Sequence, residues 1–86
     1  MTPYEVGQQV YWKWMGRKIF GEIVEVHMAP ISREIKGKLI KRNGSHEKPA
    51  YLVKSVAGNY ALKLQTEIYL ENEASKLALL DKKLKL

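Results

Sequence analysis

Short runs of alternating apolar and polar residues follow one another between residues 9 and 70 of the chain. A period of two residues indicates β-strands that each have one buried face. The predicted strands are residues 9–15, 18–28, 33–42, 50–56, 60–64 and 68–70. Strands this short and this regularly spaced predict a mainly β protein, a small barrel of about five or six strands.

The same alternation separates the side chains expected in the core from those expected in solvent. The expected core side chains are Val10, Trp12, Val24, Val26, Leu52, Leu62 and Leu64. Thr66 comes soon after the last of these, and we expect it to cap a single helical turn before the final short strand.

Glycines mark the expected turns and bends. Asn43-Gly44 is the strongest turn signal, because both residues tolerate the positive φ that a type I′ turn requires. We also expect turns at Gly16-Arg17 and Gly58-Asn59. Gly21 and Gly37 lie inside extended runs, where glycine often marks a β-bulge or bend. Such bends would help the sheet to close on itself.

The last part of the chain differs in character. Residues 72–86 are rich in good helix formers, and Leu77, Leu80 and Leu84 fall on one helical stripe. A helix this short is marginal alone, so it must dock on the barrel, dock on a partner or fray. We therefore divide the chain into a barrel, residues 1–71, and an appended C-terminal α-helix, residues 72–86.

Composition limits the class of protein. The chain has 86 residues, 45% of them hydrophobic and 28% charged, which suits one soluble domain. It has no cysteine, which removes disulfide scaffolds and thiolate metal sites and fits a reducing compartment. No apolar run approaches the roughly 18 residues of a membrane span, and no signal peptide is recognisable. We expect a cytoplasmic protein with no membrane partner.

Positive charge is concentrated in the middle of the chain. Residues 33–48 hold six basic and two acidic residues, so this stretch carries +4 of the formal net charge of +6. A basic stretch of this kind favours an anionic partner such as nucleic acid or a nucleotide. The alternative is that the lysines only keep an exposed strand soluble and unpaired.

No catalytic motif is recognisable, and we expect neither an enzyme nor a cofactor or metal site. The two histidines, His27 and His46, lie in separate predicted elements without a carboxylate pair at a catalytic spacing. His27 lies within a strand and is expected to be structural. His46 lies in a loop beside Glu47, where it either faces water or contacts an anion.

Aromatic side chains are the second candidate carrier of function. Trp12 is expected in the core, whereas Trp14, near a strand end, suits either the rim of the core or an exposed platform. Exposed rings beside a basic strand would stack on unpaired bases or enclose a cationic side chain. The candidate ligand-binding residues are Trp14, Lys36, Lys38, Lys41, Arg42, His46, Lys48 and Tyr51.

Two blocks of sequence resemble a known family. They are Val6-Gly7-Gln8-Gln9-Val10-Tyr11-Trp12-Lys13-Trp14 and Lys41-Arg42-Asn43-Gly44-Ser45 with the following Pro49-Ala50-Tyr51-Leu52. With weaker similarity between and after these blocks, residues 4–71 resemble the hypervirulence-associated protein family with a Tudor-like domain. The resemblance implies an SH3-like, Tudor-type barrel. Thr66 stands where the family pattern has serine, and residues 72–86 have no counterpart in it.

Two functions remain open from the sequence. The first is a non-enzymatic module that binds an anionic ligand, with lysines on the phosphates and an aromatic ring on a base. The second is a protein-interaction adaptor that uses barrel grooves, or that binds a partner or a second copy through Leu77, Leu80 and Leu84. A reader of modified lysine is disfavoured, because a converging aromatic cage cannot be assembled from the sequence.

Overall fold

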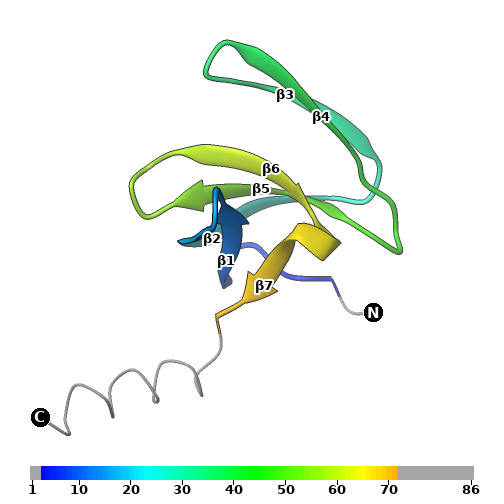
Figure 1. The fold of residues 1–86 in the computed structure, drawn as a ribbon. Helices are drawn as coiled ribbons and strands as arrows, with labels where there is room; N and C mark the ends of the chain where they lie inside the picture. The colour runs from blue at the N-terminus through cyan, green and yellow to red at the C-terminus, as the bar shows by residue number, and fades with distance from the viewer. Residues whose placement is uncertain (1–2, 72–86) are drawn as a thin grey trace, which may run out of the picture.

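The computed structural model describes residues 3–71, which form a mainly β protein of seven strands (Figure 1). The strands are β1 (Gln9–Trp14), β2 (Arg17–His27), β3 (Pro30–Ile35), β4 (Lys38–Asn43), β5 (Ala50–Ser55), β6 (Tyr60–Leu64) and β7 (Ile68–Leu70). A 3₁₀ turn, Gln65–Glu67, joins the last two strands. The expected tail helix, residues 72–86, and its Leu77, Leu80 and Leu84 lie outside the described residues.

The strands form one large antiparallel sheet and one separate hairpin. The large sheet has the order β6-β5-β2-β1-β7, and β3 pairs only with β4. In Figure 1 this hairpin arches above β5 and β6. The expectation of a closed barrel is therefore wrong. The hairpin forms no hydrogen-bonded ladder with β6 or β7, the edge strands of the large sheet, so the strands do not close into a ring.

Both tight hairpins place a non-glycine residue at positive φ. The β3–β4 turn has Lys36 at φ 52° and Gly37 at φ 78°, and the β1–β2 turn has Met15 at φ 48° and Gly16 at φ 78°. Two consecutive positive φ angles are typical of a type I′ turn, whose twist matches that of the strands. The expected bulge at Gly37 is therefore wrong, and this glycine divides the predicted strand 33–42 into two strands.

Asn43-Gly44, the strongest turn signal of the sequence, does not form a type I′ turn. Asn43 ends β4, and Gly44 does not have a positive φ. Instead Gly44 is buried, and an added Cβ would lie 2.8 Å from the carbonyl oxygens of His27 and Ala29. Glycine is needed here because two backbone segments pass close to each other.

The bulge in β2 lies at Val24 and not at Gly21, where the sequence predicts it. The register between β2 and β5 shifts between Ile23 and Glu25, whereas Gly21 pairs regularly with Ser55. The bulge at Val24 reverses which side chains of β2 point to which face. Ile23 consequently lies in the core in place of Val24.

The main core lies on one face of the five-stranded sheet. It consists of Val10, Trp12, Ile23, Tyr51, Val53 and Ile68. Leu52 and Leu62 are buried too, but they face each other across β5 and β6 on the opposite side of the sheet, toward the hairpin. Four of the seven expected core residues are thus buried, whereas Val24, Val26 and Leu64 are half-buried.

The last connection is stabilised by Glu67 and not by Thr66. The Glu67 carboxylate accepts a hydrogen bond from the Leu64 backbone N–H at 2.8 Å, at the start of the 3₁₀ turn. Thr66 is exposed and does not cap the turn, so that expectation is wrong. The predicted final strand, residues 68–70, is confirmed as β7.

Candidate functional site

A groove of about 500 Å³ separates the hairpin from the sheet. The sheet contributes Val24, Glu25 and Leu52 to its wall, and β3 contributes Arg33 and Ile35 among others. Strand parity explains this arrangement, because Arg33 and Ile35 share the face of β3 that is half-buried against the sheet. The groove is therefore lined by apolar side chains with a charged group on each side.

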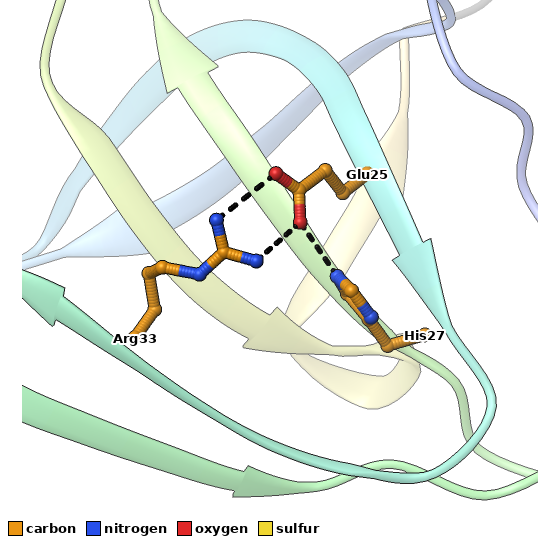
Figure 2. A network of polar contacts seen from close by, with 3 residues as sticks. All are labelled: Glu25, His27 and Arg33. Atoms are coloured by element: carbon orange, nitrogen blue, oxygen red, sulfur yellow. Dashed lines mark hydrogen bonds and ion pairs between the residues drawn. The ribbon is translucent and has the colours of Figure 1, made fainter.

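Two charged groups of the groove, Glu25 and Arg33, form a three-residue network with His27, shown in Figure 2. Arg33 donates two hydrogen bonds to the Glu25 carboxylate, Nη2 to Oε1 at 2.7 Å and Nη1 to Oε2 at 3.1 Å. His27 Nε2 lies 2.7 Å from Oε1 of the same carboxylate. The hydrogen bond from His27 lowers the pKa of Glu25, and Arg33 lowers it further, while partial burial opposes them. Glu25 is thus held as an anion between two donors.

A second arginine fixes the other strand of the hairpin. Arg42 Nε, on β4, donates to Glu67 Oε1 at 3.3 Å. Glu67 also accepts the hydrogen bond from the Leu64 N–H. Two Arg–Glu pairs, Arg33–Glu25 and Arg42–Glu67, therefore link both strands of the hairpin to the body of the protein. The predicted ligand residue Arg42 is already engaged within the fold.

The predicted lysines have no such partner. Lys36, Lys38, Lys41 and Lys48 are exposed, and none forms an ion pair within residues 3–71. Lys36 lies in the hairpin turn, and cross-strand pairing places Lys38 opposite Ile35 and Lys41 opposite Ser32. Because these two positions have opposite parity, the lysines of β4 are divided between both faces of the hairpin.

The loop after the hairpin carries two more predicted residues, His46 and Lys48, both exposed. A short closed turn presents them. The Ser45 N–H donates to the Lys48 carbonyl at 3.0 Å, and the Lys48 N–H donates to Ser45 Oγ at 3.0 Å. The loop therefore holds a histidine and a lysine at the surface, in a defined backbone conformation.

The two predicted aromatic ligand residues differ completely in environment. Trp14 is 59% exposed and lines a hollow of about 310 Å³ with Trp12, Lys36 and Lys63 among others. Tyr51 is fully buried, and its hydroxyl accepts a hydrogen bond from the Tyr4 N–H and donates one to Gln65. Burial raises the pKa of Tyr51. The prediction that Tyr51 contacts a ligand is therefore wrong, because no side of its ring reaches the surface.

Comparison with known protein families shows the family of this chain. The model of the hypervirulence associated proteins TUDOR domain matches residues 7–68. The chain belongs to this family. No curated protein and no solved structure shows a significant match. The matched segment of this Tudor domain contains all seven strands except the end of β7, and it includes the hairpin and both Arg–Glu pairs.

Sequence reasoning did not find one cluster of this Tudor domain. Tyr11, Phe20 and Tyr69 form a row across β1, β2 and β7, with ring centroids 5.7 Å apart for Tyr11–Phe20 and 5.1 Å for Tyr11–Tyr69. The β1–β2 turn carries the missing signal. Once Met15-Gly16 is recognised as the turn, counting back along both strands places Tyr11 opposite Phe20.

Within residues 3–71, no three histidine or acidic side chains gather as metal ligands would. The same part of the chain contains no helix with the length and apolar character needed to cross a bilayer.

Proposed function

We propose that this Tudor domain is a non-enzymatic binding module for an anionic ligand, nucleic acid or a nucleotide, and that the projecting hairpin makes the first contact. The observation that supports this proposal is the division of charge on the hairpin. Its two arginines are paired with Glu25 and Glu67, whereas Lys36, Lys38 and Lys41 extend into solvent. The arginines position the hairpin, and the lysines are available for phosphates.

The net charge of the chain favours the same class of partner. A formal charge of +6 on 86 residues attracts polyanions at long range. Each lysine that neutralises a phosphate also releases counterions, so the affinity should fall steeply as salt is added. The predicted residues Lys48 and His46 extend the basic surface into the loop that follows the hairpin.

The hollow that contains Trp14 supplies a ring next to this basic surface. Lys36 lines that hollow together with Trp14, so a cation from the hairpin turn and an exposed indole meet at one place. A base or a nucleotide ring can stack on the indole while its phosphate lies near the lysine. We place this binding in the cytoplasm, which the absence of cysteine favours.

The test is an NMR titration of the labelled 86-residue chain with duplex DNA, single-stranded RNA and a dinucleotide, each at two salt concentrations. The variant Lys38→Glu/Lys41→Glu should weaken binding whatever the base sequence, because phosphate contacts carry no sequence information. The variant Lys82→Glu/Lys83→Glu changes the net charge equally outside the hairpin and is the matched control. Arg42 is left unchanged, since its loss would disturb the fold through Glu67.

The outcomes separate the possibilities. Shifts centred on the hairpin and on Trp14, weakened by the hairpin variant and not by the control, support the proposal. Equal weakening by both variants shows that only net charge matters, and it overturns the hairpin as the site. A protein that binds none of the three probes at low salt is not an anion-binding module, and the adaptor function then takes its place.

A further inference from the structure

An aromatic row lies on the face of the sheet opposite the core. It consists of Tyr11 on β1, Phe20 directly opposite on β2 and Tyr69 directly opposite on β7. The Tyr11 and Tyr69 rings are stacked, with 21° between their planes. Phe20 is 40% exposed and Tyr69 is 45% exposed. Three adjacent strands thus carry three rings in one line, of which the outer two are exposed and Tyr11 is half-buried.

Strand parity explains why these rings are outside. Val10 and Trp12, the neighbours of Tyr11, point into the core, so Tyr11 must point to the other face. The hairpin packs beside β6, at the far side of the sheet from β7, and does not cover the row (Figure 1). Cross-strand aromatic pairs stabilise a sheet by themselves, so the rings alone do not imply a ligand.

Two lysines beside the row favour an anionic ligand. Lys13 and Lys18 are directly opposite each other on β1 and β2, on the same face as the rings. Like charges directly opposite in a sheet are destabilising, and neither lysine forms an ion pair within residues 3–71. Lys18 Nζ also lies 5.0 Å from the centroid of the Tyr11 ring.

Glu22, an acidic residue on this face, does not relieve this repulsion. Glu22 is two positions further along β2 than Phe20, where it pairs with Gln9 on one side and with Lys54 on the other. The row runs across the strands, so Lys13 and Lys18 lie along one side of it and Glu22 lies along the other side. An anion bound between the two lysines would remove a repulsion that the free protein carries.

We propose that this surface, the aromatic row with Lys13 and Lys18, binds single-stranded nucleic acid. Unpaired bases stack on the exposed rings of Phe20 and Tyr69, which flank Tyr11, and Lys13 and Lys18 contact the phosphates. A duplex does not fit this chemistry, because its bases are already stacked on each other. This proposal rests on the proposed function for the class of ligand, nucleic acid. It places the binding on a different surface of the protein.

The test measures fluorescence anisotropy of labelled ten-nucleotide oligo(dT) and oligo(rU), and of a duplex of equal length, with the full chain. Tyr69→Leu and Phe20→Leu keep apolar volume and remove a ring, and each should weaken single-strand binding about 5- to 100-fold. Tyr69→Phe keeps the ring, so a loss of binding in this variant as large as in Tyr69→Leu would overturn ring stacking as the cause. Circular dichroism of each variant confirms that the sheet is intact.

The lysines are tested by salt dependence. Lys13→Gln/Lys18→Gln should lower the slope of log affinity for the single strands against log salt by about 1.4, about 0.7 for each lost phosphate contact. Lys82→Gln/Lys83→Gln removes the same charge elsewhere and should leave the slope nearly unchanged.

The result distinguishes this inference from the proposed function. Single-strand binding that is unchanged in Tyr69→Leu and Phe20→Leu, but lost in Lys38→Glu/Lys41→Glu, overturns the aromatic row and leaves the hairpin as the site. Binding lost with the rings and unaffected by the hairpin variant supports the row and overturns the hairpin. The absence of binding to every probe overturns both.

Discussion

Removal of one buried hydroxyl should destabilise the whole domain. Tyr51, at the centre of the core, joins two segments that lie outside the sheet. Its hydroxyl accepts from the Tyr4 N–H at 3.0 Å and donates to Gln65 Oε1. Tyr51→Phe removes this oxygen with almost no change of shape, so the effect on stability comes from the hydrogen bonds alone.

The magnitude follows from the burial of the two partners. Gln65 is buried and would keep an acceptor without a donor, at a cost of about 1 to 3 kcal/mol. Tyr4 is only half-buried, so water can replace the hydroxyl at its N–H. We expect a loss of about 2 kcal/mol, which lowers the Tm of a domain of this size by about 8 to 16 °C.

Thermal unfolding followed by circular dichroism measures this difference. Tyr69→Phe is the matched control, since Tyr69 is 45% exposed and its hydroxyl has no hydrogen-bond partner within residues 3–71. The control should change stability by less than about 0.5 kcal/mol. A Tyr51→Phe variant as stable as this control would refute the argument that the hydroxyl joins the two segments to the core.

Three further predictions concern the network, the core and the tail. The pKa of Glu25 is lowered in the folded state, so its contribution to stability is present above its ordinary pKa of 4.5 and is lost as the pH falls through the lowered value. Urea unfolding should therefore show a smaller loss of stability between pH 7 and pH 3 in Glu25→Gln than in the parent protein, and an equal loss would contradict this. Trp12→Ala should cost about 3 to 5 kcal/mol because the ring is buried, and a smaller change in the urea midpoint would show that the core repacks. Truncation after Glu71 should leave the far-ultraviolet spectrum of the sheet intact, and an unfolded product would show that the domain boundary is wrong.

Local pattern was sufficient to predict the strands but not their connections. Alternation predicted β1, β5, β6 and β7 to within a residue at each end, because each has a regular pleat. It missed the break between β3 and β4, because the turn places Lys36, which has no special preference for positive φ, beside Gly37. It also missed the bulge at Val24, since a bulge of this kind needs no glycine.

The residue types of the candidate site could be predicted from the sequence better than their positions in the fold. Five of the six basic residues of the 33–48 stretch lie on the β3–β4 hairpin, and Lys48 lies in the loop that follows it. The separation of paired arginines from unpaired lysines could not be predicted, because Glu67 is 25 residues from Arg42 in the chain. Tyr51 was misassigned because β5 is buried on both faces, so alternation there does not distinguish inside from outside.

The attachment of the hairpin by side chains has a consequence for how the protein opens. Since β3 and β4 share no backbone ladder with the large sheet, the hairpin can detach without breaking any of the hydrogen bonds that hold the five strands together. Release requires only the separation of two Arg–Glu pairs and of the apolar side chains between the layers. The hairpin therefore forms its own cooperative unit, whose amide hydrogens should exchange with solvent sooner than those of β2 and β5.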